Sequence, residues 1–479
     1  MSADYSRTEL LASTATAVAG DLLNHLERQV VVVSCDAKPA MLSAGRILLT
    51  TLRRLPIVLV FAAAKIANDD IDAIIDAVAS VDPERPLHID QRDGLRVHIG
   101  VDAPKGVLRV IPSRHGAHVV RDGRTIDPAP ASPLGGSMSA AFAAAEVFKD
   151  VVRVRRERRA DVAHYAFCPV TLTDRPEAAP PLPLPFHFSG TLVGLGAIGS
   201  ATAMILGEME TEGNIDLVDR QVYANENVTT YSLGGQIDAF AGVWKTELAE
   251  RALRRATCRR FDERIEDYVI RVEDGSIAPP RIVLAGLDSP EARHETQRLW
   301  PDLLIDGATG DTMLGLHVVR DAGQPCMRCF VRVPAVTESP YARLSELTGL
   351  SIEKLREGDT VLREEDLAAV STEQRERLAT HVGKKICALA QVVGLTDLSS
   401  ESFRPSAAFV SLGAACLVVG RLVGVELGVA PQENFIQYDA LFGPGGATID
   451  VRRADTECYC VQRNAVIERV REERFTKAV

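Results

Sequence analysis

The segment Thr191-Leu-Val-Gly194-Leu-Gly196-Ala-Ile-Gly199 decides the fold that we expect for this chain. Its glycines follow an apolar run that predicts a strand and precede a stretch, ending near Gly207, that predicts a helix. In such a turn the backbone N–H groups and the helix N-terminus can approach a phosphate closely. A tight packing turn between a strand and a helix would need the same glycines, so the pattern alone leaves both interpretations open.

The residues that follow repeat this strand–helix alternation. Apolar runs at 215–218 and 282–285 predict strands, and the periodicity of 245–255 predicts a helix between them. The alternation indicates a doubly wound parallel sheet, which binds ligands at the carboxyl ends of its strands. Asp219 follows the second strand about 20 residues after the glycines, where a carboxylate can bind a ribose hydroxyl. The sequence therefore predicts a nucleotide site.

A second α/β pattern precedes this one but has no glycine-rich turn. Its predicted strands and helices lie at 30–33, 57–61, 107–111, 41–52 and 137–151. Five prolines between 176 and 185 follow a basic run and favour an extended chain. We expect residues 1–152 to form a degenerate copy of the second domain, with residues 153–186 as a basic, proline-rich linker.

Residues 337–400 interrupt the second pattern. They are charge-rich and helical in periodicity, with no strand-like run, and are expected to be an insertion between 187–336 and 401–479. The apolar stretch that starts at Ala407 runs into Arg421 and predicts a buried helix rather than a membrane span. The predicted fold class is thus α/β, with two doubly wound parallel-sheet domains, one of them degenerate, and a helical insertion.

The amino-acid composition and net charge indicate which classes of molecule the protein is expected not to bind. The chain has 479 residues, of which 46% are hydrophobic and 25% charged, and its net charge is −11. This acidic balance argues against nucleic-acid and membrane-surface partners. The first residues do not resemble a signal peptide, and nine cysteines that include a Cys-x-x-Cys pair fit reduced thiols better than a disulfide framework. We therefore expect a cytoplasmic protein.

Several features in order along 190–330 resemble the ubiquitin-activating and sulfur-carrier-adenylating enzymes of the MoeB–ThiF type. They are the glycines at 194, 196 and 199, then Asp219, Asn225, Lys245 and Asp288, and finally the pair Cys326 and Cys329. The order and approximate spacing of the whole set are much more specific than any one feature. The resemblance implies that the nucleotide is ATP and that the reaction is adenylation of the C-terminal glycine of a ubiquitin-like protein.

The resemblance also implies roles for single residues. Asp219 would bind the ribose, Asn225 and Lys245 the phosphates, and Asp288 a magnesium ion. Lys245 and magnesium would offset the repulsion between a carboxylate and the α-phosphate that it attacks. Simpler roles remain open for three of them: Asn225 as a turn former, Lys245 as a solvated residue, and Asp288 as a helix N-cap.

One phosphate-binding residue of the family is missing. Relatives usually carry an arginine where this chain has Val228. The segment Tyr5-Ser-Arg7 resembles the one with which relatives extend an arginine into a partner domain's ATP site, so Arg7 is the candidate replacement. A disordered terminal arginine is the alternative, and a non-catalytic nucleotide-binding scaffold is the alternative function that Val228 suggests.

Two pairs of cysteines predict a zinc site. Cys326 and Cys329 follow a predicted strand, as in relatives with structural zinc, and Cys458 and Cys460 would complete four tetrahedral ligands. The second pair departs from the usual Cys-x-x-Cys spacing. Unmetallated thiols are the alternative.

Cys387 is the candidate for a thioester. It lies in the insertion, where thioester-forming relatives carry their catalytic half-domain, and Lys384 and Lys385 beside it would favour the thiolate. A buried helical cysteine is the alternative. The implied reaction sequence ends with transfer to a conjugating enzyme, and the layout resembles bacterial ubiquitin-like conjugation systems, including those of antiphage defence. A sulfur-carrier adenylase without a thioester step is the second enzyme hypothesis.

Overall fold

The computed structural model describes residues 4–18, 20–90, 92–103, 106–320, 324–331, 340–356, 361–368, 370–379, 381–383, 386 and 406–477. They belong to two compact units. One comprises Met1–Val331 and Pro405–Val479, and the other comprises Arg332–Arg404.

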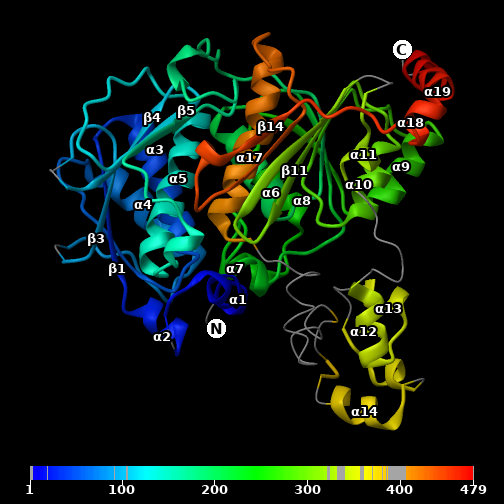
Figure 1. Cartoon of the computed structure of the whole chain (residues 1–479), viewed down its shortest axis with the longest axis horizontal. Helices are drawn as coiled ribbons and strands as arrows, with labels where there is room; N and C mark the ends of the chain where they lie inside the picture. The colour runs from blue at the N-terminus through cyan, green and yellow to red at the C-terminus, as the bar shows by residue number, and fades with distance from the viewer. Residues whose placement is uncertain are drawn as a thin grey trace. The chain divides into compact units, whose positions relative to one another are not determined.

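The first part of the larger unit forms a six-stranded sheet in the order β2-β1-β3-β4-β5-β6 (Figure 1). The strands are β1 (Val30–Cys35), β2 (Val58–Phe61), β3 (Leu95–Ile99), β4 (Leu108–Ser113), β5 (Gly116–Val120) and β6 (His164–Phe167). The first four are parallel, and β5 and β6 are antiparallel. The predicted strands at 30–33, 57–61 and 107–111 correspond to β1, β2 and β4, whereas β3 and β5 were not predicted. β6 lies within the predicted linker 153–186: Ala166 and Phe167 are buried, but so short a run between charged residues and prolines was not predicted to be a strand.

The second part forms an eight-stranded sheet in the order β14-β13-β12-β11-β10-β7-β8-β9. Its strands are β7 (Gly190–Val193), β8 (Asn214–Val218), β9 (Thr257–Phe261), β10 (Ile282–Ala285), β11 (Leu303–Gly310), β12 (Met313–Val319), β13 (Phe435–Asp439) and β14 (Thr448–Asp450). The five neighbouring strands β11, β10, β7, β8 and β9 are parallel to one another. Strands β12, β13 and β14 extend the sheet beyond β11 by antiparallel pairing. The predicted α/β class is confirmed, with antiparallel strands added at one side of each sheet.

The two sheets repeat one arrangement. The order β2-β1-β3-β4-β5-β6 corresponds, strand by strand, to β8-β7-β10-β11-β12-β13, and the direction reverses at the same place in both. Helix α3 (Pro39–Leu52) follows β1 as α6 (Ala197–Glu208) follows β7. Helices α5 (Pro133–Val151) and α17 (Ala408–Glu426) follow β5 and β12, and they pack on each other between the sheets, with the Phe148 and Phe409 rings 5.1 Å apart (Figure 1).

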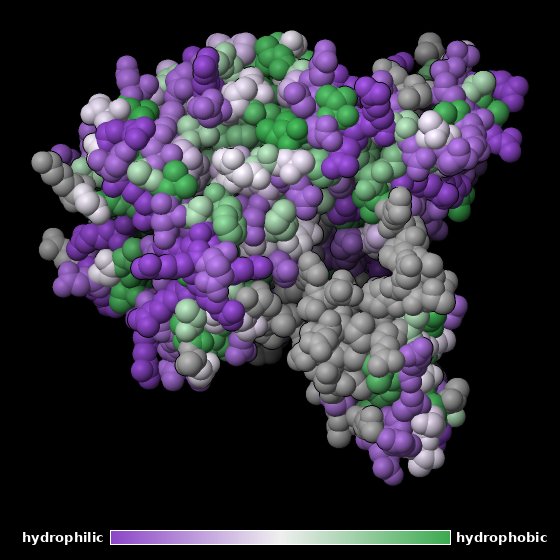
Figure 2. Space-filling model, in the orientation of Figure 1, coloured by the Kyte–Doolittle hydropathy of each residue, from purple (hydrophilic) through white to green (hydrophobic). Residues whose placement is uncertain are grey.

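Helix α17 consists mainly of apolar and small residues. It is long and apolar enough to cross a membrane, but 94% of its most apolar window is buried inside the protein. It is therefore the core helix that the sequence predicts. The other helices of this unit are α1 (Ser6–Ala15), α2 (Leu22–Glu27), α4 (Asn68–Val81), α7 (Gln236–Ala241), α8 (Lys245–Ala252), α9 (Ile265–Glu273), α10 (Pro290–Gln297), α11 (Met327–Phe330), α18 (Tyr459–Gln462) and α19 (Asn464–Lys477). On the face drawn in Figure 2, hydrophilic residues surround small groups of apolar ones.

The smaller unit is helical where it is described. It contains α12 (Pro340–Thr348), α13 (Ile352–Arg356) and α14 (Thr372–Ala379). Its core is a leucine-rich cluster that includes Leu344, Leu355, Leu362 and Ile386. Cys387, Lys384 and Lys385 lie outside the described residues.

Candidate functional site

The glycine-rich turn connects β7 to α6. Gly194 has φ +76°, and its N–H donates to the Val218 carbonyl at 2.9 Å. A Cβ at Gly199 would lie 2.1 Å from the Gly194 carbonyl oxygen, so these two glycines are required by the tight turn itself. Gly196 is different: a Cβ there would meet nothing closer than the Tyr231 hydroxyl at 3.6 Å. Gly196 is also the N-cap of α6 and has no side chain to cap the first N–H groups. The turn thus satisfies the packing interpretation and also leaves the helix N-terminus accessible to an anion.

Asp219 lies beside this turn, directly after β8. Its carboxylate accepts hydrogen bonds from the backbone N–H groups of Leu195 at 2.7 Å and Gln221 at 2.8 Å. Burial raises the pKa of Asp219, Lys245 and the two N–H groups lower it, and Asp288 raises it further. Gln221 joins Asp219 to Lys245, because its N–H donates to Asp219 and its side-chain oxygen accepts from Lys245. Asp288, which follows strand β10, adds a like charge.

Lys245, the first residue of α8, is only 4% exposed. Its Nζ donates to the Tyr231 hydroxyl at 2.8 Å and to the Gln221 side-chain oxygen, and it lies 5.0 Å from the centroid of the Tyr231 ring. The solvated role that the sequence left open for Lys245 is therefore wrong. Lys245 is thus a buried cation held beside Asp219, whose pKa it lowers.

Asp288 is exposed and follows β10. The N-cap of α10 is Ser289, whose hydroxyl accepts from the Ala292 N–H at 3.1 Å, so the capping role considered for Asp288 is wrong. Arg293 holds the loop that carries Asp288. It donates to the Leu287 carbonyl at 2.8 Å and pairs with buried Asp306 at 3.3 Å. An exposed carboxylate on a fixed loop is suited to bind a hydrated cation.

Asn225 and Val228 belong to the short helix η3 (Asn225–Asn227) and the loop that follows it. Asn225 is exposed, whereas Asn227 is buried and accepts from the Ala224 N–H at 2.9 Å. Val228 is 1% exposed and packs in a cluster with Tyr5 and Tyr231. The position that carries arginine in relatives is thus an apolar packing position in this chain.

Arg7 lies on α1, next to the loop after Val228. The chain is ordered here because Tyr5 is buried and its hydroxyl donates to Asp82 at 2.8 Å, so the alternative of a disordered terminal arginine is wrong. Arg7 is half-buried and lines a small cavity with Thr229 and Thr230. The structure thus brings Arg7 to the loop that follows Val228.

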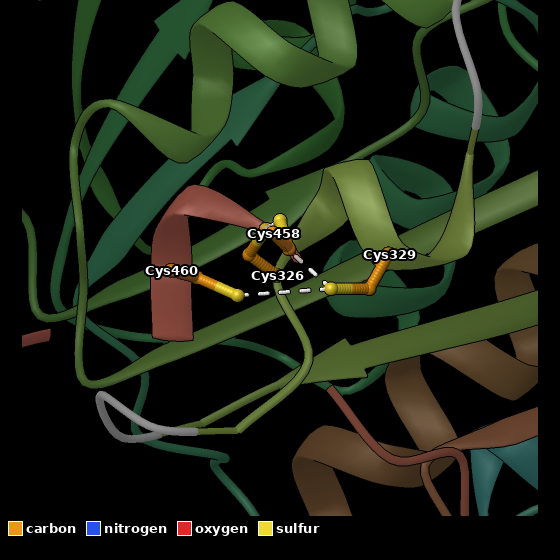
Figure 3. A group of neighbouring side chains, drawn as sticks. All are labelled: Cys326, Cys329, Cys458 and Cys460. Atoms are coloured by element: carbon orange, nitrogen blue, oxygen red, sulfur yellow. Dashed lines mark hydrogen bonds between the residues drawn. The ribbon is translucent and has the colours of Figure 1, made fainter. Parts of the chain in front are cut away.

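The four paired cysteines form one cluster (Figure 3). The sulfur–sulfur distances are 4.0 Å for Cys326–Cys329, 3.6 Å for Cys326–Cys458 and 3.6 Å for Cys329–Cys460. Four sulfurs at 2.3 Å from a tetrahedral zinc ion would lie about 3.8 Å apart. The donor set and the spacing therefore fit zinc, and the Cys-x-Cys spacing of the second pair does not prevent the fit.

The remaining described cysteines lie in apolar surroundings. Cys35, Cys168 and Cys416 are buried, and burial raises the pKa of Cys35 to about 12. Cys258 lies in β9, and burial raises its pKa to about 11. Thiols of this kind hold little thiolate at neutral pH. The thioester candidate Cys387 is among the residues that the structure does not describe.

The first sheet carries a different group at the equivalent edge. Asp36 follows β1 as Gly194 follows β7, and its carboxylate is bonded to His98 Nε2 at 2.9 Å and to the Val101 N–H at 2.9 Å. The other ring nitrogen of His98 bonds the Ser34 hydroxyl at 2.9 Å. The first sheet thus carries a hydrogen-bonded carboxylate where the glycine turn begins in the second sheet.

The sequence did not predict the residues that support the site. Tyr231 and Gln221 hold Lys245, and the buried group Arg293, Asp306 and His317 lies under the Asp288 loop, with His317 and Asp306 hydrogen-bonded at 2.9 Å. Asp306 lies level with Ala285 at the carboxyl edge, which was a usable signal. Tyr231 lies in an irregular loop, where no periodicity indicates its direction.

The profile of the ThiF family matches residues 186–460, which is more than half of the chain. No curated protein matches the chain. Solved structures that resemble it include E. coli MccB with MccA-N7isoASN and the microcin C7 biosynthetic enzyme MccB with N-formylated MccA; each is 16% identical over 57% of this chain and 67% of the other, with a TM-score of 0.36.

Proposed function

Because the chain belongs to the ThiF family, we propose that it uses ATP to adenylate the C-terminal carboxylate of a ubiquitin-like protein. One arrangement supports the proposal above all: Asp219 is hydrogen-bonded to the glycine turn, Gln221 joins it to Lys245, and Asp288 follows β10, the strand that pairs with β7. Parallel α/β sheets bind nucleotides at this edge.

The proposed chemistry assigns a task to each residue. Asp219 binds the ribose hydroxyls of ATP, and the N–H groups at the uncapped start of α6 approach its phosphates. Lys245 and Asn225 bind the phosphates, and Asp288 holds magnesium, which neutralises phosphate charge when bound. A carboxylate oxygen of the protein substrate attacks the α-phosphorus, the bond to the bridging oxygen breaks, and pyrophosphate leaves. The Lys245 ammonium stabilises the charge that develops.

We also propose that the two halves have different tasks. Residues 1–152 form the degenerate domain, since Asp36 and His98 occupy the edge where a nucleotide would bind. Residues 187–336 and 401–479 form the active domain. Residues 337–400 are the catalytic-cysteine insertion. The protein is proposed to act in the cytoplasm, where ATP and reduced thiols are both present.

Zinc is proposed to be structural. Cys326, Cys329, Cys458 and Cys460 would hold it, and it would fix the C-terminal segment to α11. None of these cysteines lies in the glycine turn or beside Lys245, so zinc would supply stability and no chemical step.

A thioester step is proposed at Cys387. Its thiolate attacks the carbonyl carbon of the acyl-adenylate, a carbon–sulfur bond forms, the bond to the AMP oxygen breaks, and AMP leaves. The thiol proton passes to solvent. A conjugating enzyme would then receive the ubiquitin-like protein by exchange with its own thiol, and antiphage defence is the proposed setting.

The Cys387→Ala variant tests this step. It should keep ATP–pyrophosphate exchange at the wild-type rate and lose the covalent adduct with the ubiquitin-like protein, because the thiol acts only after the adenylate exists. Non-reducing gels, with and without reducing agent, measure the adduct. Cys258→Ala is the control, since the raised pKa of Cys258 makes it a poor nucleophile. An adduct that persists in Cys387→Ala would refute the assignment, and exchange without any adduct in the wild type would favour the sulfur-carrier alternative.

The Arg7→Ala variant tests whether Arg7 replaces the arginine that is absent at Val228. We expect a slower adenylation step, by about tenfold or more, because an arginine near the phosphates stabilises the charge of the transition state. A point variant is preferable to a truncation, since Tyr5 and Thr8 are buried and a truncation would remove packing as well. Single-turnover adenylate formation measures the rate, and thermal unfolding checks the fold. A rate equal to that of wild type would leave Val228 without a substitute and favour the scaffold alternative.

A further inference from the structure

Arg54 is a buried arginine from the first half that contacts the second half. It follows α3 and is only 2% exposed. Its guanidinium donates to the backbone carbonyls of Val228, Ser232 at 2.9 Å and Gly234 at 3.2 Å. The Tyr223 hydroxyl lies beside the same guanidinium, so backbone carbonyl dipoles and one phenol surround its charge.

These three carbonyls surround Tyr231 in sequence. The Val228 carbonyl precedes Tyr231, and the carbonyls of Ser232 and Gly234 follow it. The same loop is also tied to the helix of the glycine turn, since the Ser232 N–H donates to the Ser200 hydroxyl at 3.2 Å. One planar group with fixed donors therefore sets the path of the loop on both sides of Tyr231.

Tyr231 connects this loop to the nucleotide site. Its hydroxyl accepts from Lys245 Nζ at 2.8 Å, and the same oxygen is the nearest atom to a Cβ built on Gly196, at 3.6 Å. A shift of the loop would thus move the group that holds Lys245 next to the glycine turn. The Val228 side chain packs with Tyr5 and Tyr231 in the apolar cluster, so the loop is held by packing as well as by Arg54.

We propose that Arg54 is a positioning residue of the nucleotide site: through the 228–234 loop and Tyr231, it holds Lys245 in place for the phosphates of ATP. The inference rests on the proposed function and deepens it, because it gives the half without a glycine turn a direct part in nucleotide binding. The hydrogen bonds of Arg54 go to the loop carbonyls, so its effect on Lys245 is exerted through the loop.

Binding of MgATP to the purified full-length chain, measured by equilibrium dialysis, tests the proposal without any protein substrate. Arg54→Met should weaken binding by about tenfold or more, since three hydrogen bonds from a charged donor are lost. The MgATP affinity of Arg54→Lys should lie between those of the wild type and Arg54→Met, because an ammonium keeps the charge but not the planar donor geometry.

Arg53 provides a matched control. It is 1% exposed and also donates to carbonyls, but these belong to Arg85, Leu55 and Ile57 in the first half. Arg53→Met should lower the unfolding temperature and leave MgATP affinity close to wild type. If Arg53→Met and Arg54→Met weaken MgATP binding equally, or if neither weakens it, Arg54 is structural and the proposal fails.

A double-mutant cycle examines the path through Tyr231. Tyr231→Phe removes only the hydroxyl that contacts Lys245, so it stays informative even if Arg54→Met does not fold. It should weaken MgATP binding, and the double variant should bind about as weakly as Arg54→Met alone. Wild-type MgATP affinity in Tyr231→Phe, or additive losses of affinity in the double variant, would show that Arg54 does not act through Tyr231. Absence of MgATP binding by the wild-type protein would instead refute the proposed function.

Discussion

Replacing Lys245 by alanine should lower the rate of adenylate formation by about a hundredfold or more, the usual loss when one preorganised charge is removed from a reacting centre. The structure gives the reason: the ammonium is buried, Tyr231 and Gln221 fix its position, and Gln221 also donates to Asp219 beside the glycine turn. A positive charge held there is placed to act on the phosphates of the proposed ATP. Single-turnover formation of the adenylate measures the effect.

Arg251→Ala is the control for this variant. Arg251 lies on the same helix, α8, but its side chain is about half exposed and is paired with Asp238 and Glu247. Its loss removes one positive charge from the same element and should leave the rate unchanged. Near wild-type adenylation in Lys245→Ala would remove Lys245 from the site, and an equal loss in Arg251→Ala would indicate a general effect of charge.

Replacing Cys326 by serine should remove the bound metal and destabilise the protein. A structural zinc ion contributes several kcal/mol to folding, and each kcal/mol shifts Tm by about 2–4 °C in a domain of 150–250 residues. We therefore expect the Tm to fall by roughly 10 °C. Elemental analysis should give about one zinc per wild-type chain and much less in the variant.

Cys258→Ser is the control for the metal site, because Cys258 lies in β9 and outside the cluster. It should keep the zinc content of wild type. The site would lose its assignment if freshly purified wild-type protein held no metal and all four clustered thiols reacted readily with an alkylating agent.

The sequence predicted three strands of the second sheet, β7, β8 and β10, because their signals are local. Apolar runs, the glycine spacing and Asp219 depend on residues close in the chain, and their positions in β7, β8 and α6 follow from strand and helix periodicity. The sequence also paired Cys326 and Cys329 with Cys458 and Cys460, because four ligands are needed for one tetrahedral ion.

What the sequence did not predict depends on contacts between distant residues. In the sequence, Arg54 is a charged residue after an apolar helix, which predicts a solvent-exposed side chain. Only the packing of the two halves brings it to the carbonyls around Tyr231. The strand β6 was missed because a short run gains its stability from pairing with β5 rather than from its own propensity. The capping role of Ser289 instead of Asp288 depends on a shift of one residue, which is within the uncertainty of any helix boundary taken from sequence.

ATP–pyrophosphate exchange tests the central claim most directly. The purified chain is mixed with MgATP, labelled pyrophosphate and a ubiquitin-like protein that ends in glycine, and the same protein without its terminal glycine serves as the control. The account predicts that label enters ATP only with the intact C-terminus and that Lys245→Ala abolishes the incorporation. Wild-type protein that binds MgATP but incorporates no label with any such substrate would contradict adenylation and leave a nucleotide-binding scaffold as the function.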